Sequence, residues 1–280
     1  METDYLYSFL IRYPLLPSLA LWRCMEARLF AKLELEDPVL DIGCGNGHFA
    51  CVALRTPLLS GCDRDVSQVK RALSLKVYRQ AVAGDICSLP YRDRSFATII
   101  CNCALEHIAD LEQALQEVFR LLTPGGTFVF TVPTEKFNEW FYLSWLLRKL
   151  RLSKSAQIQI DRYNRFQFHH HIYSVREWSA RLAAAGLQME RHDYYASQGL
   201  LFVWSALDDI QHSLARLGKP KGSSSEACSA QLGERFVGTA VASLMARLWW
   251  LFLTPFYRRE LSADGMGAAA LIRARKPASQ

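Results

Sequence analysis

Three acids stand at or beside the ends of apolar stretches in the first third of the chain. Asp41 lies in the run Val39–Phe49, Asp63 closes the run from Leu58, and Asp85 follows Gly84. The carboxyl ends of the strands of an α/β sheet meet at one edge, where such folds bind their ligands. The spacing therefore predicts a nucleoside-binding edge built from three strand ends.

Glycines at every second position follow the first of these acids, at Gly43, Gly45 and Gly47. Without a Cβ atom, the backbone can turn sharply there and let a ligand approach closely. The spacing departs from the G-x-G-x-x-G fingerprint of dinucleotide sites, and no Lys follows as in a phosphate loop. The turn therefore need not hold a phosphate, and an NAD site is disfavoured.

Five motifs in the expected order resemble the class I S-adenosylmethionine-dependent methyltransferases, in particular their type 11 small-molecule branch. The resemblance covers residues 36 to 135, with a weaker echo from His171 to Asp193, and its motifs are Val39–Phe49, Gly61–Asp65, Gly84–Pro90, Ser95–Asp110 and Leu121–Thr127. It implies a Rossmann-like methyltransferase fold with seven strands. The alternation of strands and helices from 38 to 132 independently predicts an α/β, doubly wound, mostly parallel sheet.

The resemblance also implies a cofactor, S-adenosyl-L-methionine, with S-adenosyl-L-homocysteine as product. The turn Gly43, Cys44, Gly45 and Gly47 is expected against its methionine part, with Asp41 near the amino group. The nucleoside is assigned to Asp63 at the ribose hydroxyls, Arg64 beside it, and Asp85 and Ile86 at the adenine. Asn102 and Cys103 are expected beside the sulfonium. Two alternatives stay open: Asp63 as a helix N-cap, and Asp85 as a turn residue.

Two histidines are candidates for a catalytic general base. His107 follows the fourth predicted strand, and His171 ends the run His169–His171. An imidazole is suited to accept a proton from a hydroxyl acceptor near neutral pH. The alternative is that Glu106-His107 only shapes its loop and that the histidines of the run are solvated. Consecutive histidines point in different directions and no C-x-x-C pair is present, so no metal site is predicted.

The organisation of the chain is predicted in four parts: an N-terminal helical cap at 1–35, a cofactor-binding core at 36–194, a helical and partly hydrophobic insertion at 195–265, and a final strand and tail at 266–280.

A helix is expected over Leu19–Leu33. Another is expected over Leu111–Leu122, with Asp110 as its cap and Pro124–Gly126 as its end. A capping box at Ser174–Glu177 opens a third, to Ala185. Strands are expected over Thr127–Val132, Leu187–Tyr194 and Ala268–Ala274, and a flexible linker over Gly218–Ser225.

Residues 136–172 combine aromatic side chains with seven bases and two acids. One interpretation is a lid that grips an apolar acceptor, and the other is a set of amphipathic helices that bury an aromatic face.

The stretch Phe236–Tyr257 is rich in Leu, Phe and Trp, with Arg247 near its centre. It is expected to lie on a membrane or to roof a lipid-like substrate; a core helix or a homodimer helix is the alternative. The charged Arg247 disfavours a membrane span.

Composition and the first residues indicate the cellular compartment. The 280 residues carry a net charge of +6, half are hydrophobic, and eight are Cys. The acidic start is unlike a signal peptide, and scattered Cys fit a reducing cytoplasm, so we expect a cytoplasmic protein, peripheral at the inner membrane face if at a membrane.

The sequence predicts a methyltransferase for a small hydrophobic or lipid-linked acceptor, methylated at oxygen. The first alternative is a protein of the same fold that binds S-adenosylmethionine without catalysis. A nucleic-acid methyltransferase ranks lower, because Asn102-Cys103-Ala104-Leu105 provides neither an Asn-Pro-Pro-Tyr-like nor a Pro-Cys motif, and no nucleic-acid partner is expected.

Overall fold

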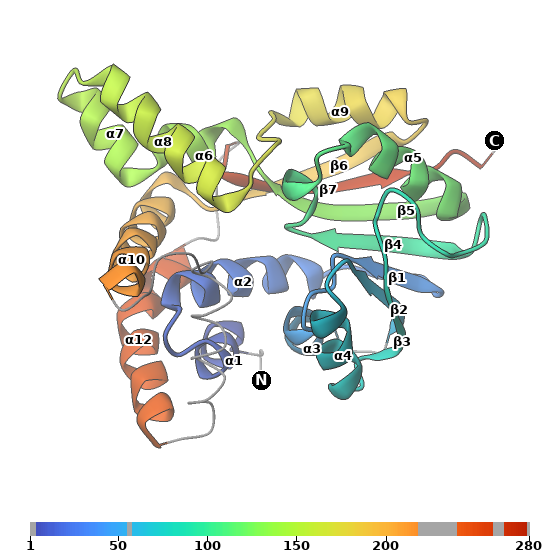
Figure 1. The fold of residues 1–280 in the computed structure, drawn as a ribbon, viewed down its shortest axis with the longest axis horizontal. Helices are drawn as coiled ribbons and strands as arrows, with labels where there is room; N and C mark the ends of the chain where they lie inside the picture. Colours follow the sequence, from blue (N-terminus) through green and yellow to red (C-terminus); the bar gives the residue numbers. More distant parts are fainter. Residues whose placement is uncertain (1–3, 55–57, 218–239, 260–265, 279–280) are drawn as a thin grey trace.

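The computed structural model describes residues 4–54, 58–217, 240–259 and 266–278. Its centre is a seven-stranded sheet in the order β3-β2-β1-β4-β5-β7-β6 (Figure 1). The strands are β1 (Val39–Ile42), β2 (Leu58–Asp63), β3 (Tyr78–Ala83), β4 (Phe96–Asn102), β5 (Leu122–Pro133), β6 (Gln188–Tyr195) and β7 (Ala269–Arg275). Only the pairings of β7 with β5 and β6 are antiparallel among the described strands, and the other four pairings are parallel, so the predicted doubly wound, mostly parallel sheet is confirmed.

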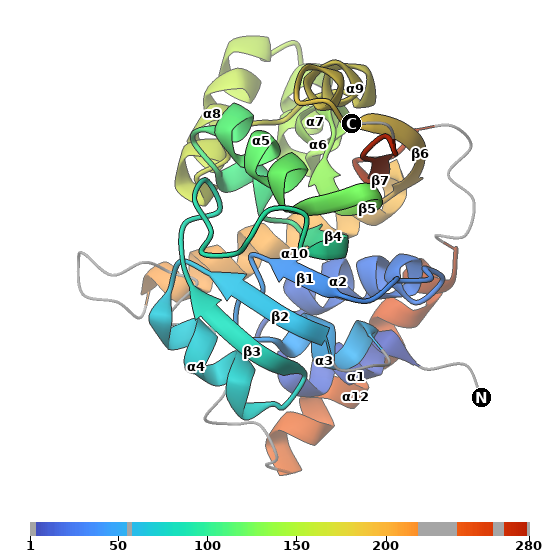
Figure 2. The same cartoon turned by 90° about the vertical axis from the view of Figure 1, so that its right-hand side faces the viewer.

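Helices cover both faces of the sheet, because side chains along each strand alternate between two apolar clusters. Ile100 and Val129 belong to the cluster that includes helices α1 (Tyr5–Arg12), α2 (Pro17–Phe30), α3 (His48–Ala53) and α4 (Val66–Ser74). Ile99 and Phe128 belong to the other cluster, under α5 (Leu111–Leu121) and α9 (Val175–Ala184). Figure 2 shows the two helical layers on either side of the sheet.

Local capping follows the sequence closely. The Asp110 carboxylate accepts from the Gln113 backbone N–H at 3.1 Å, and Ser174 and Glu177 form the predicted capping box of α9. One expectation is wrong: Pro124–Gly126 do not end α5. The helix stops at Leu121, and β5 starts at once at Leu122, so these residues lie inside the strand beside a register shift of β4.

The segment between β5 and α9 forms α6 (Glu135–Trp140), α7 (Tyr142–Lys149) and α8 (Ser153–Gln167). Three of its aromatic rings, Phe137, Phe141 and Tyr163, are buried. Phe137 lies 5.5 Å from Trp204, and Phe141 lies 4.6 Å from Tyr163, ring centre to ring centre. These rings are buried in the same cluster as α2. In this structure the segment is therefore a group of amphipathic helices with a buried aromatic face.

The described residues between β6 and β7 include the helices α10 (Gln198–Leu217) and α12 (Ala240–Arg259). The last two predicted strands are confirmed to within one residue at each end. The expected linker Gly218–Ser225 lies outside the described residues, as do Phe236–Thr239 of the apolar stretch. No observation divides the chain at residues 35, 194 or 265, so the four-part organisation stays a prediction.

Candidate functional site

A cavity of about 410 Å³ opens at the carboxyl ends of β1, β2, β3 and β4. The strand order reverses between β1 and β4, and this switch point is where open α/β sheets bind ligands. Six predicted site residues line the cavity together: Gly43, Asp63, Arg64, Asp85, Ile86 and His107. The other seven, Asp41, Cys44, Gly45, Gly47, Asn102, Cys103 and His171, are not part of its lining.

The glycine turn is held in a shape that a side chain would break. Gly43 has a φ of 72°, and a Cβ atom there would lie 2.6 Å from the Cβ of Ala104. Its N–H donates to the Cys62 carbonyl at 2.8 Å. The Gly45 N–H donates to Asp63 Oδ2 at 3.0 Å, so the turn orients the acid that faces the cavity.

The two alternatives left open for the acids have different outcomes. Asp63 is not the N-cap of α4, because Asp65 takes that place and accepts from the Ser67 N–H at 2.7 Å. Asp85 does have a turn role, since its Oδ1 accepts from the Cys87 N–H at 2.9 Å. Asp85 is nevertheless exposed and lines the cavity, so both acids present carboxylates to a ligand.

Asp41 lies below the cavity and is buried. Burial raises the pKa of Asp41 to about 7. The Tyr78 hydroxyl donates a hydrogen bond to Asp41 Oδ2 at 2.5 Å, and this bond acts in the opposite direction by lowering the pKa. Sequence reasoning missed Tyr78. Its ring reaches Asp41 because Gly47 and Gly61 leave room, a Cβ at either position lying 3.1 to 3.3 Å from ring atoms. Small residues on two separate elements facing one aromatic ring give no signal in the sequence.

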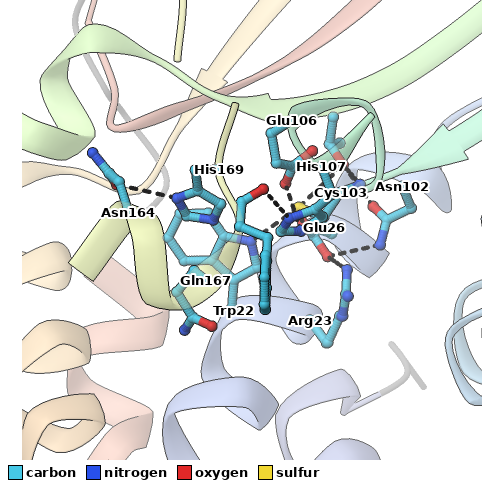
Figure 3. A network of polar contacts seen from close by, with 12 residues as sticks. Trp22, Arg23, Glu26, Asn102, Cys103, Glu106, His107, Asn164, Gln167 and His169 are labelled. Carbon is cyan, nitrogen blue, oxygen red and sulfur yellow. Dashed lines mark hydrogen bonds and ion pairs between the residues drawn. The ribbon is translucent and has the colours of Figure 1, made fainter. Parts of the chain in front are cut away.

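A buried polar network centred on Glu26 of α2 lies beside the end of β4 (Figure 3). Glu26 Oε1 accepts hydrogen bonds from Cys103 Sγ at 2.7 Å and from Tyr195 OH at 3.0 Å. Glu26 Oε2 accepts from Asn102 Nδ2 at 2.9 Å and from Arg23 Nη1 at 2.8 Å. The side chains of Asn102 and Cys103 are thus bonded to a helix that precedes the sheet. Sequence reasoning missed Glu26, whose signal was an acid in the middle of an apolar helix.

Glu106 is a second buried carboxyl group in this region, next to the cavity residue His107. Its Oε2 has no hydrogen-bond partner among the described residues, and Oε1 lies 3.9 Å from His107 Nε2. Burial raises the pKa of Glu106 to about 8. A carboxyl group of this kind is held neutral by its surroundings unless a cation arrives.

The histidines differ in what their rings can do. His107 lines the cavity and its Nδ1 lies 3.3 Å from the Phe168 carbonyl oxygen. His171 bonds the Tyr173 hydroxyl at 2.9 Å and the Ile108 carbonyl at 2.8 Å with its two ring nitrogens, and burial lowers its pKa. Its neighbour His170, which sequence reasoning did not select, lines the cavity instead. Of the two candidates, His107 alone reaches the cavity, and a catalytic role for either stays a prediction.

Among the described residues, no group of three or more His, Cys, Asp or Glu is arranged to hold a metal ion. The cavity instead combines carboxylates with a glycine turn and the apolar side chains of Ile42, Ile86 and Ile108. Such a set suits an organic ligand with hydroxyl or amino donors and a flat apolar part.

Comparison with known proteins finds similarity over part of this chain. Residues 40–130 match the family described as a methyltransferase domain. An uncharacterised methyltransferase of Mycobacterium bovis is 32% identical over 114 residues, which are 39% of this chain and 58% of that protein. Botryococcene C-methyltransferase of Botryococcus braunii is 33% identical over 37% of this chain and 30% of its own length. The chain therefore spans less than two thirds of these relatives.

Two solved structures show how far the fold likeness extends. Geranyl diphosphate methyltransferase in complex with SAM has a TM-score of 0.52 and 15% identity, covering 93% of this chain and 90% of its own. The [4+2]-cyclase SpnF has a TM-score of 0.54 and 18% identity, covering 90% of this chain and 80% of its own. Since a cyclase and a methyltransferase share this architecture, the likeness shows the fold alone.

Proposed function

We propose that this protein, whose residues 40–130 match a family described as a methyltransferase domain, is a class I S-adenosylmethionine-dependent methyltransferase that transfers a methyl group to a hydrophobic, lipid-like acceptor. The observation that carries the proposal is the cavity at the strand switch point, where Gly43, Asp63 and Asp85 come together from three strand ends.

The chemistry of the donor set fits the cofactor. Asp63 and Asp85 offer carboxylate oxygens to ribose hydroxyls and to an adenine amino group, and Ile86 offers an apolar surface beside them. The buried acids Asp41, Glu26 and Glu106 lie around the same strand ends. S-adenosylmethionine carries a sulfonium and an ammonium group, so an acidic surrounding favours it over a phosphate-bearing nucleotide.

The chain's own residues would do two things for the transfer. When bound, S-adenosylmethionine supplies an electrophilic methyl group on a positively charged sulfur. The glycine turn and Asp63 would fix the position of the donor, which converts the transfer into a reaction between aligned groups. With a hydroxyl acceptor, His107 would accept the proton that leaves the oxygen as the new bond to carbon forms.

The lipid-like acceptor rests on two supports. Buried aromatic rings from α2, α6, α8 and α10, among them Trp22, Phe137, Tyr163 and Trp204, make the region beside His107 and His169 apolar. Related proteins carry names such as squalene methyltransferase and demethylmenaquinone methyltransferase. Oxygen as the methylated atom stays our proposal for this chain. Carbon is the alternative, since one relative is named botryococcene C-methyltransferase.

A transfer assay tests the proposal. The protein is incubated with methyl-labelled S-adenosylmethionine and a fractionated cell extract, and label is counted in lipid, water-soluble and macromolecular fractions. We expect label in the lipid fraction. If oxygen is the acceptor, alkaline hydrolysis releases the label from a methyl ester, and hydriodic acid releases it from a methyl ether. Tight cofactor binding without label in any fraction would favour the non-catalytic alternative, and label in nucleic acid would contradict the proposal.

A further inference from the structure

The outward face of α12 carries large apolar side chains in contact with solvent. Val241, Leu244, Leu248, Leu251 and Phe252 are between 52% and 64% exposed. Their spacing of three and four residues places them on one side of the helix. Contiguous apolar surface of this kind marks an interaction site in a soluble domain.

The opposite face of α12 fixes this orientation. Ala242, Ala246 and Leu253 are buried, and the helix packs on α1 and α2. Trp250 Nε1 donates to Asp4 Oδ2 at 2.6 Å. Arg28 donates to the Tyr257 carbonyl at 3.3 Å and lies 4.8 Å from the centre of the Tyr257 ring. The apolar face therefore cannot turn inward without breaking these contacts.

Charge distinguishes among the partners that could cover this face. The helix Ala240–Arg259 holds Arg247, Arg258 and Arg259, all exposed, and no acid. An apolar face edged by cations complements acyl chains beneath anionic headgroups. A second copy of the same face would bring like charges together, which disfavours a dimer through α12.

The turn between α7 and α8 repeats this composition on the same side of the molecule. Lys149, Leu150, Arg151, Leu152 and Lys154 are all exposed. The helix α10 contacts both α7 and α12, and the three follow one another along the left side of Figure 1, with α1 and α2 on the inner side of α12. We therefore treat the two places as parts of one surface.

We propose that the docking surface, defined as the exposed apolar residues of α12 and the turn 149–154, binds a bilayer that contains anionic phospholipid, with α12 lying in the plane of the interface. By length and composition α12 could also cross a membrane. Its lengthwise packing on α1 and α2 favours the parallel arrangement, because insertion would strip the helix from the body. The proposal does not rest on methyl transfer.

Sedimentation of the full chain with vesicles tests it. One set is pure phosphatidylcholine, and the other is phosphatidylcholine and phosphatidylglycerol at three to one. We expect binding to the anionic set that weakens as NaCl rises. The double variant Leu244→Gln and Leu248→Gln, which changes no charge, should lower the partition coefficient at least about tenfold. Arg258→Gln with Arg259→Gln should reduce the preference for anionic vesicles.

Two controls make the result decisive. Leu73→Gln removes an exposed leucine from α4 and should leave binding unchanged. Thermal unfolding of each variant shows that the fold is kept. Failure to bind either vesicle, or binding that the leucine variants leave intact, would overturn the proposal. A dimer that the leucine variants dissociate, seen by light scattering, would also overturn it and assign the face to a second copy.

Discussion

At the scale of single residues, two buried carboxyl groups hold protons more tightly than they do in water. Burial raises the pKa of Asp41 to about 7 and that of Glu106 to about 8. Raised carboxyl pKa values beside a cavity are typical of sites that bind a cation or move a proton. The glycine turn and the cavity acids Asp63 and Asp85 were predicted from the sequence, because they directly follow or end apolar stretches that have the length of strands.

These carboxyl groups make the ligand-free protein lose stability as the pH rises. Above the ordinary carboxyl pKa the unfolded chain has released protons that the folded protein still holds, so the unfolded state binds fewer protons and the free energy of unfolding falls with pH. We expect this loss between about pH 5 and about pH 8.5 to be smaller in Glu106→Gln than in the wild-type protein. Urea unfolding at the two pH values measures it, and equal losses in the two proteins would contradict the assignment.

At the scale of elements, α2 is tied to the end of β4 by one acid. Glu26 is bonded to Arg23 of its own helix, Asn102 and Cys103 at the end of β4, and Tyr195 at the end of β6. The sequence predicted this helix and both strand ends, because apolar periodicity is local. It could not predict the tie, because Tyr195 stands 169 residues from Glu26 along the chain.

Removing this acid should loosen α2. Glu26→Ala leaves the Arg23 guanidinium, the Asn102 amide and the Tyr195 hydroxyl without their shared acceptor, and we expect a loss of about 3 kcal/mol of unfolding free energy. The matched control is Glu34→Ala, since Glu34 is exposed and should contribute less than about 0.5 kcal/mol. Denaturant unfolding measures both, and equal small losses would show that the network contributes little.

The aromatic segment shows why composition alone could not choose between two interpretations. Its rings and its bases were both visible in the sequence, and a lid and a set of surface helices need the same pattern. The choice depends on partners that lie far along the chain, such as Trp22 and Trp204, which pack on Phe137. Tertiary contacts of this kind carry no local signal.

At the scale of the whole molecule, the sheet, the cavity and α12 lie in one body with different roles. The mostly parallel sheet and both final strands followed from the sequence, because the alternation of strands and helices limits the topology. The orientation of α12 did not, since an apolar helix with an arginine near its centre suits a core, a dimer and a membrane surface alike. Its buried small residues, Ala242 and Ala246, show which side faces the body.

Ligand binding should stabilise the whole body. S-adenosylmethionine at about one hundred times its dissociation constant should raise the free energy of unfolding by about 2.7 kcal/mol, because only the folded protein has the cavity. NAD at the same concentration should leave it unchanged, since the glycine spacing lacks the dinucleotide fingerprint. Thermal unfolding with each ligand measures the shift, and stabilisation by NAD alone would contradict the assignment of the cavity.

The central claim is that S-adenosylmethionine binds through Asp63, and calorimetric titration of Asp63→Ala tests it most directly. We expect affinity for S-adenosylmethionine to fall about 100-fold, because the carboxylate would accept from the ribose and also orients the Gly45 N–H. Asp65→Ala, two residues away, should lose about 1 kcal/mol of stability as a helix cap and keep its affinity. Unchanged affinity in Asp63→Ala, or equal losses of affinity in the two variants, would contradict the account.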